Sequence, residues 1–206
     1  MSQLVNHAHR FIRKVDLFRS CCSRIEQQFE CGQLRISEVE LVYSSSFLSV
    51  CAQWEALLEE VLFEAICGEE SKKKSNRRLV KFSSKKHLEE ILLFPSKKYL
   101  GLSSVKDASK LAALFVRKGM PISAIGMSRR SYLSEAVSIR NAIAHQGGYA
   151  MREFRRRVPG VLDLRPVKRF PGAFLRHQFR SSPSQRRCEL YFAAFKAAAN
   201  DLAEAW

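Results

Sequence analysis

The sequence predicts an all-α protein, an up-and-down helical bundle with a basic insertion at 68–104 and a short arginine-rich extended or hairpin segment at 149–181. Two observations predict this class. Apolar residues recur at spacings of three and four over long stretches, which is the period of amphipathic helices. The breaks between these stretches carry glycine and proline, which end helices. A length of 206 residues fits one domain, and we expect residues 1–206 to form a single helical domain.

A long helix is expected to open the chain and to end at Cys31-Gly32. Its apolar seam consists of Leu4, Ala8, Phe11, Val15, Phe18, Cys22, Ile25 and Phe29. A seam of this kind needs a partner helix, from the same chain or from a second copy.

The second helix is expected to begin at Ser37, because Ser37-Glu38-Val39-Glu40 has the pattern of a capping box. An apolar series then continues to Gly68, and it includes Val42, Val50, Trp54, Leu57, Leu58, Val61, Leu62 and Ala65. A short turn joins the first two helices, so they are predicted to form a helical hairpin.

The middle of the chain is expected to alternate between irregular and helical structure. Residues 68–104 are predicted to be a basic, partly flexible insertion with at most one short helix, broken at Pro95. Helices are predicted from Val105 to Lys118 and from Ser128 to His145, and Gly147-Gly148 is expected to stop the second of them.

A last helix is expected after the arginine- and proline-rich residues 149–181. Ser182 has the character of an N-cap, Pro183 suits the first helical position, and Gln185 suits the capping position. The buried stripe of this helix is predicted to contain Cys188, Phe192, Phe195, Ala199, Leu202 and Trp206.

The charge of the chain points to a polyanionic partner. It has 35 Lys and Arg against 20 Asp and Glu, a formal charge of +15, and nucleic acid is the simplest partner for such a balance. The basic residues gather in two runs, Lys72–Lys98 and Arg152–Arg187. The alternative is that these runs only keep surface loops solvated. A membrane-surface protein is disfavoured, since neither run has a clear amphipathic helical pattern.

The cysteines and the absence of apolar segments predict a cytoplasmic location. Six cysteines show no C-x-x-C spacing, so they are expected to be reduced and mostly buried thiols. No window resembles a signal peptide or a membrane span, and no membrane partner is expected. Phosphate-loop, zinc-ligand and nucleophile-elbow motifs are also missing from the sequence, so no cofactor and no metal are expected.

The stretch SIRNAIAHQGG, residues 138–148, holds the candidate catalytic residues Arg140, Asn141 and His145. An arginine four to six residues before a histidine is a weak signal alone, because chance produces such pairs in an arginine-rich chain. On a helical wheel, however, Arg140 interrupts an apolar stripe, while Asn141 and His145 belong to an adjoining polar stripe. A charge on a packing face needs a partner. A glutamate of the second helix (Glu55 or Glu59) or a phosphate would serve.

These three residues suit metal-independent cleavage of RNA. A histidine can take and give a proton near neutral pH, so His145 is expected to deprotonate the 2′-hydroxyl or to protonate the leaving group. Arg140 is expected to bind the phosphate oxygens, and Asn141 to orient the imidazole or the phosphate. The alternative is that His145 only caps the helix. His87 and His177 are expected to be surface residues.

The segment IRNAIAHQ at a helix end and QWEALLEEVL on an earlier long helix resemble the HEPN superfamily, most closely its prokaryotic toxin and antiphage group. The signature of this family is an arginine, often followed by Asn, Asp or His, and a histidine after four to six intervening residues. Arg140, Asn141 and His145 match it position by position. The resemblance does not account for 68–104 or 149–181.

The resemblance implies an all-α HEPN fold, a homodimer and a metal-independent endoribonuclease that gives a 2′,3′-cyclic phosphate. It also implies a toxin or antiphage effector, whose partners are RNA and an antitoxin or other neutralising protein. Some family members are non-catalytic RNA-binding or adaptor modules, and this is the alternative function for the chain. A DNA-binding regulator is a third possible function. Some related toxins carry a tyrosine two residues after the histidine, which an antitoxin modifies. Here Gly147 stands at that position and the nearest tyrosine is Tyr149, so that modification is not expected.

Overall fold

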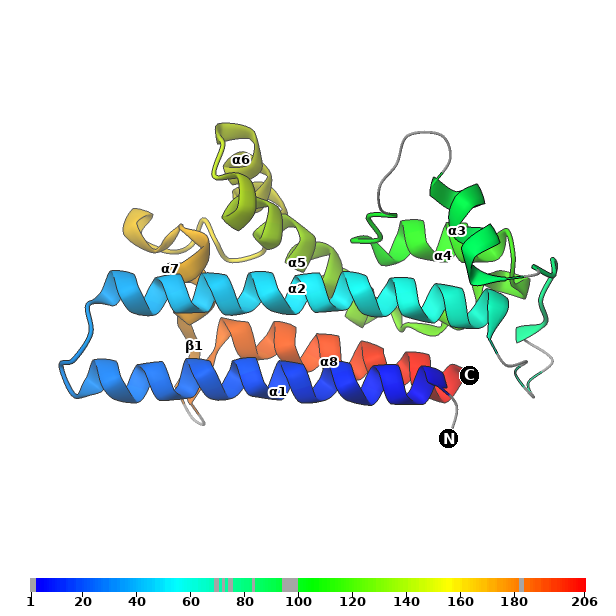
Figure 1. The fold of residues 1–206 in the computed structure, drawn as a ribbon. Helices are drawn as coiled ribbons and strands as arrows, with labels where there is room; N and C mark the ends of the chain where they lie inside the picture. Colours follow the sequence, from blue (N-terminus) through cyan, green and yellow to red (C-terminus); the bar gives the residue numbers. More distant parts are fainter. Residues whose placement is uncertain are drawn as a thin grey trace. The chain divides into compact units, whose positions relative to one another are not determined.

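The chain is all-α, as predicted, apart from one small hairpin. The computed structural model describes residues 3–68, 71, 73, 76–82, 84–93, 100–181 and 184–206. The α-helices of this part are α1 (Gln3–Glu30), α2 (Ile36–Cys67), α3 (Lys85–Leu93), α4 (Val105–Ala113), α5 (Met127–His145), α6 (Gly148–Arg157), α7 (Pro171–Arg176) and α8 (Arg187–Ala205) (Figure 1). They are joined by the 3-10 turns η2 (Arg117–Gly119), η3 (Ile122–Ala124) and η4 (Pro166–Lys168) and by strands β1 (Gln178–Ser181) and β2 (Ser184–Arg186). None of the described helices combines the length and the apolar character needed to cross a bilayer.

The fold separates into two compact units, and each is assembled from distant stretches of the sequence. Unit 1 contains Met1–Ile12, Gln53–Arg130 and Ala197–Trp206, and unit 2 contains Arg13–Ala52 and Ser131–Lys196. The division falls within α1, α2, α5 and α8, so the two units are described one at a time. The assignment of 1–206 as one HEPN-like domain stays a prediction.

In unit 1, residues of the basic insertion cap the ends of helices. The Arg78 guanidinium donates to the carbonyl of Ala65 at 3.0 Å and to that of Gly68 at 2.5 Å, at the end of α2. The Asn76 side chain donates to the carbonyl of Ala205 at 2.8 Å, at the end of α8. The last carbonyls of a helix lack partners within it and carry partial negative charge, so basic and amide donors stabilise them.

The short helix expected in this insertion is α3, whereas the predicted helix 105–118 is too long. α4 ends at Ala113. Val116 is extended and pairs with Arg78 in an isolated bridge, and Lys118 has a φ of 58°. Tertiary pairing of the chain therefore overrides the helical pattern after Ala113. Pro95, the predicted break after α3, lies outside the described residues.

In unit 2, the C-terminal part of α1 and the N-terminal part of α2 form the predicted hairpin. α2 begins earlier than the predicted Ser37. Gly32 in the turn has a φ of +73°, a conformation that glycine adopts without steric cost. The backbone N–H of Arg35 donates to the Glu38 carboxylate at 2.6 Å. The capping carboxylate is therefore Glu38 rather than Glu40, and α2 begins at Ile36.

The core of unit 2 is an aromatic cluster on α2 and α8. The ring of Phe47 lies 5.7 Å from Tyr191, 6.5 Å from Phe192 and 6.4 Å from Phe195. The Tyr191 hydroxyl donates to Glu135 of α5 at 3.0 Å. The buried residues of α5 within this unit are Leu133, Ala136, Ser138, Ile139 and Ala142. These contacts fix α5 against the other helices of the unit.

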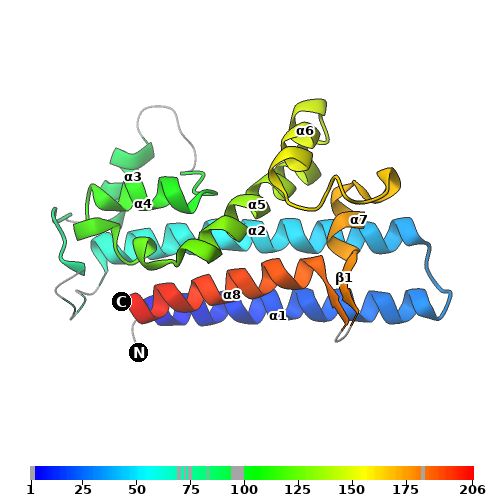
Figure 2. The same cartoon turned by 180° about the vertical axis from the view of Figure 1, so that it is seen from behind.

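The segment 149–181 is more helical than predicted. α6 and α7 occupy much of it, because Phe154 and Phe174 are fully buried against each other with ring centroids 5.5 Å apart. The expected hairpin exists at its end, where Gln178 pairs with Arg186 and Ser181 with Ser184; Figure 2 shows β1 near the start of α8. Because Ser184–Arg186 is a strand, α8 begins at Arg187 rather than after a cap at Ser182. Ser182 and Pro183 lie outside the described residues.

Candidate functional site

The three predicted site residues lie on the last two turns of α5, in unit 2. Arg140 and Asn141 are half-buried, and His145, the last residue of the helix, is exposed. The buried stripe of α5 follows Ala136, Ile139 and Ala142, so Arg140 borders this stripe rather than interrupting it.

The structure brings Arg140 and Asn141 into contact. The Arg140 Nη1 donates to the Asn141 Oδ1 at 3.1 Å. Asn141 and His145 are four residues apart on the helix, so they share one face and are neighbours along it. Arg140 and His145 are five residues apart, about 1.4 turns, so they leave the helix about 140° apart around its axis. The pairing of Arg140 with Glu55 or Glu59 stays a prediction.

The chain turns sharply directly after His145. Gln146 has a φ of +46°, the left-handed conformation that ends helices. The sequence assigned this role to Gly147-Gly148. Instead, Gly147 has a φ of −74° and caps the start of α6, whose first residue is Gly148. The turn leaves His145 at an exposed corner between two helices.

α6 begins three residues after His145 and carries a basic face whose first arginine is Arg152. Arg152, Arg156 and Arg157 are exposed, and Glu153 binds Arg156 at 2.9 and 3.0 Å and Arg157 at 2.5 Å. The hydrogen bond from Arg156 is the main cause that holds the pKa of Glu153 below its usual value. Four arginines face one glutamate on this helix, so α6 attracts phosphate.

Tyr149, in the first turn of α6, is a candidate residue that sequence reasoning missed. Its side chain is 70% exposed, and an exposed aromatic ring next to cations is typical of surfaces that stack nucleic-acid bases. The sequence did contain a pattern that indicates this face. Tyr149, Arg152 and Arg156 follow one another at spacings of three and four, which places them on one helix face.

A second polar cluster lies elsewhere in unit 2, around the buried carboxylate of Glu26. Arg176 binds this carboxylate at 2.8 and 3.1 Å, and Arg186 binds it at 3.0 Å. Burial raises the pKa of Glu26, but hydrogen bonds from Arg176 and Tyr43 and the charge of Arg186 outweigh it, so the pKa lies below the usual 4.5. No local sequence motif predicts this cluster, because Glu26 is 150 residues from Arg176 and farther still from Arg186.

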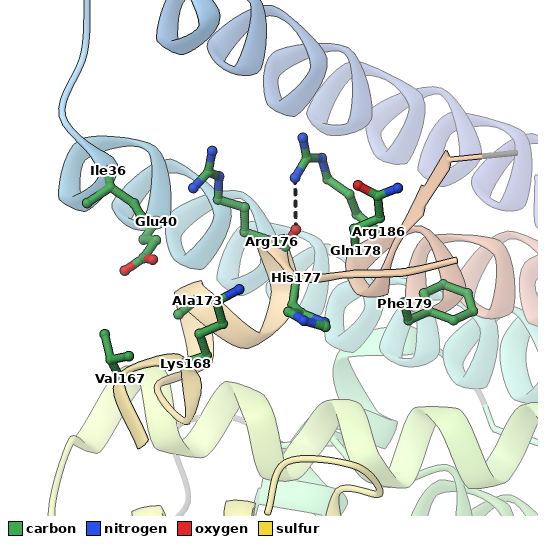
Figure 3. Close-up of a pocket in the computed structure, with 10 residues that line it drawn as sticks. All are labelled: Ile36, Glu40, Val167, Lys168, Ala173, Arg176, His177, Gln178, Phe179 and Arg186. Atoms are coloured by element: carbon green, nitrogen blue, oxygen red, sulfur yellow. Dashed lines mark hydrogen bonds between the residues drawn. The ribbon is translucent and has the colours of Figure 1, made fainter. Parts of the chain in front are cut away.

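A cavity of about 820 Å³ lies beside the Glu26 cluster, and Lys168, Arg176, His177, Phe179 and Arg186 are among its lining residues (Figure 3). His177 was expected at the surface but is half-buried here. Burial and the charges of Lys168 and Arg187 lower the pKa of its imidazole below 6.5. This lowered pKa favours the neutral form of the ring, near the cationic Lys168 and Arg187.

The cysteines and acidic residues show no metal centre in the part of the chain that is described. All six cysteines are free thiols, and Cys22, Cys51 and Cys188 are buried. Burial raises the pKa of Cys22 to about 11, which keeps this thiol protonated and unreactive. Among the described residues, no three His, Cys, Asp or Glu side chains are grouped to hold a metal ion.

Comparison with protein-family models, curated proteins and solved structures gives no match. Function is therefore inferred from the chain's own residues, above all from the arrangement of Arg140, Asn141 and His145.

Proposed function

We propose that the chain is a metal-independent endoribonuclease whose site consists of Arg140, Asn141 and His145. The observation that supports this proposal most directly is the exposed His145 one turn beyond the Arg140–Asn141 hydrogen bond of 3.1 Å, at a corner that leads into a basic helix. These are the groups that cleavage through the ribose hydroxyl needs: a proton-transfer group, an anion clamp and a basic surface that attracts the substrate.

In the proposed reaction, His145 removes the proton of the 2′-hydroxyl, and the resulting oxygen attacks the adjacent phosphorus in line with the 5′-oxygen. The phosphorus–5′-oxygen bond breaks, and the leaving oxygen takes up a proton. The products are a 2′,3′-cyclic phosphate and a 5′-hydroxyl. Arg140 binds the phosphate oxygens, whose negative charge grows in the transition state.

Asn141 positions Arg140 in this scheme. Its Oδ1 accepts from Nη1, which limits the rotation of the guanidinium and leaves less entropy to be lost when phosphate binds. The arginines of α6 hold the strand next to His145 through its phosphates.

We propose further that the enzyme acts as a homodimer in the cytoplasm, as a toxin or antiphage effector controlled by an antitoxin or another neutralising protein. Two copies related by a two-fold axis would supply one imidazole to take the proton and one to give it. This part of the proposal follows from the resemblance of IRNAIAHQ to the HEPN signature.

The test is cleavage of a labelled RNA in the presence of excess EDTA, with analysis of the product ends. We expect the wild type to cut and to leave a 2′,3′-cyclic phosphate. His145→Ala should lower the rate about 10²- to 10⁴-fold, as loss of an acid–base group does, and Arg140→Ala about 10²- to 10³-fold. His9→Ala, which removes an exposed histidine of α1, is the matched control and should cut normally.

Three outcomes would contradict the proposal. Cleavage of a fully 2′-deoxy strand would remove the mechanism, since no ribose hydroxyl is present. RNA binding without cleavage by the wild type would favour the non-catalytic RNA-binding module. Preferred binding of duplex DNA would instead favour the regulator.

A further inference from the structure

The cavity beside the Glu26 cluster has a net positive wall. Lys168, Arg176 and Arg186 line it, and Glu40 is the acidic residue of the same wall. Glu26 behind the wall neutralises one of the two arginines that it binds. Three cations therefore face two carboxylates even when Glu40 is ionised. Burial raises the pKa of Glu40, which makes its negative charge easier to lose. The cavity thus favours an anion.

The two arginines of this wall, Arg176 and Arg186, are held in place before any ligand arrives. Arg186 Nη1 donates to the carbonyl of Arg176 at 3.0 Å, the dashed line in Figure 3. The Arg176 guanidinium lies 4.3 Å from the ring centroid of Phe29 and binds Glu26 through two nitrogens. Side chains that are already fixed lose little conformational entropy on binding, and preorganised sites bind more tightly for this reason.

Two of the uncharged side chains that line the cavity are flat rings, His177 and Phe179. Figure 3 shows His177 between Lys168 and Phe179. His177 Nδ1 is buried and has no hydrogen-bond partner among the described side chains and backbone. Phe179 is 39% exposed. A cationic end and an aromatic end in one cavity match the two ends of a nucleotide, which are a phosphate and a planar base.

We propose that this cavity holds one nucleotide of a single-stranded RNA, with the phosphate at Lys168 and the base against Phe179. The inference deepens the proposed ribonuclease function and rests on it in taking RNA as the ligand. The cavity lies in the same unit as Arg140 and His145 but is lined by none of the three site residues. It therefore provides a separate contact that selects unpaired RNA, because only an unpaired base can leave its stack to enter it.

The test measures the affinity of the full chain for a fluorescein-labelled eight-nucleotide RNA by anisotropy, with His145→Ala present in every protein so that the strand is not cut. We expect Lys168→Gln and Phe179→Leu each to weaken binding about tenfold, the size typical of a lost stacking or phosphate contact. The matched controls are Lys110→Gln on α4 and Phe170→Leu, which replaces a phenylalanine that is 56% exposed and outside the cavity wall. Both should bind as the parent does.

A second measurement does not depend on these substitutions. In a histidine-ring NMR spectrum of the His145→Ala protein, addition of the RNA should shift the His177 signals and leave those of His9 in place. An unmoved His177 together with unchanged affinity of Lys168→Gln and Phe179→Leu would overturn the proposal. AMP competing as well as the RNA at equal nucleotide concentration would overturn it too, since the site would then hold a free nucleotide.

These outcomes differ from failure of the proposed function. If the wild type binds RNA through Lys168 and Phe179 but never cuts it, the cavity assignment stands and the catalytic assignment of His145 falls. If the wild type cuts RNA and both cavity variants bind RNA with unchanged affinity, the catalytic assignment of His145 stands and the cavity assignment falls.

Discussion

At the scale of single residues, Glu26 shows how a buried carboxylate organises this protein. Its side chain is 7% exposed and shared by Arg176 and Arg186. Replacing a buried ion pair with apolar groups is often tolerated, whereas removing one partner leaves an uncompensated charge. Glu26 is the only carboxylate found to bind both arginines in the described ion pairs, so losing it would strand two charges at once.

We therefore predict that Glu26→Gln lowers the free energy of unfolding at pH 7 by about 3 kcal/mol, the size seen when one partner of a buried pair is removed. Urea unfolding followed by circular dichroism measures it. Glu30→Gln, which neutralises an exposed carboxylate at the end of the same helix, is the matched control and should change little.

The pH dependence of this effect has a definite sign. The pKa of Glu26 is lower in the folded than in the unfolded chain, so its ionisation contributes stability above the unfolded value of 4.5 and loses it as the pH falls below 4.5 through the folded pKa. The difference in unfolding free energy between wild type and Glu26→Gln should shrink below pH 4.5. A difference that stays constant from pH 7 to pH 3 would show that the carboxylate charge is not the cause.

At the scale of elements, α5 and α6 show what the sequence predicts and what it misses. α5 was expected from Ser128 to His145 and runs from Met127 to His145, because its stop and its apolar period are local features. α6 was missed, since its one buried aromatic, Phe154, gains a partner only when Phe174 folds against it. Arg140, Asn141 and His145 are close in sequence, so a local pattern was enough to propose them as a site. The Glu26 cluster depends on distant pairing and was not.

The place of Tyr149 on α6 predicts a role in holding RNA. We expect Tyr149→Ala to weaken RNA binding about tenfold through loss of a stacking partner, while Tyr149→Phe keeps the ring and binds normally. Anisotropy of the labelled RNA in the His145→Ala protein measures both. Equal weakening by Phe and Ala would show that the hydroxyl matters rather than the ring.

The approach of α7 to α2 depends on Gly172. A Cβ at this position would lie 2.4 Å from the carbonyl oxygen of Glu40 and 2.6 Å from the Ser44 Oγ, closer than van der Waals contact allows. Gly172→Ala should therefore push α7 away from α2 and destabilise the protein by about 1–3 kcal/mol, the usual result of overpacking. Thermal unfolding measures this. Gly148→Ala is the control, because its Cβ would meet nothing nearer than 3.7 Å; a loss of stability equal to that of Gly172→Ala would contradict the steric argument.

At the scale of the whole molecule, the charge of +15 acts in opposite directions on the two proposed associations. It attracts RNA, so added salt should weaken that complex through counterion release. It makes two copies repel each other, so added salt should favour a homodimer, since exposed charges are screened within about 8 Å at physiological ionic strength. An assay of a dimeric nuclease on this chain therefore needs intermediate salt, where the copies associate and RNA still binds.

A mixing experiment under those conditions tests whether two copies share one site. Arg140→Ala and His145→Ala alone are each expected to cut RNA at least about 10²-fold more slowly than the wild type. After the two are mixed and allowed to exchange subunits, about half of the dimers should be mixed by random pairing.

A mixed dimer still holds one intact arginine and one intact histidine, on opposite copies. If the site pairs the arginine of one copy with the histidine of the other, cleavage should return to a measurable fraction of the wild-type rate, although the second imidazole is missing. If each copy works alone, every site in the mixture lacks one group and cleavage stays at the rate of the single variants. Light scattering on the same sample gives the mass of the particle, and a dimeric mass without restored cleavage would separate association of the copies from sharing of the site.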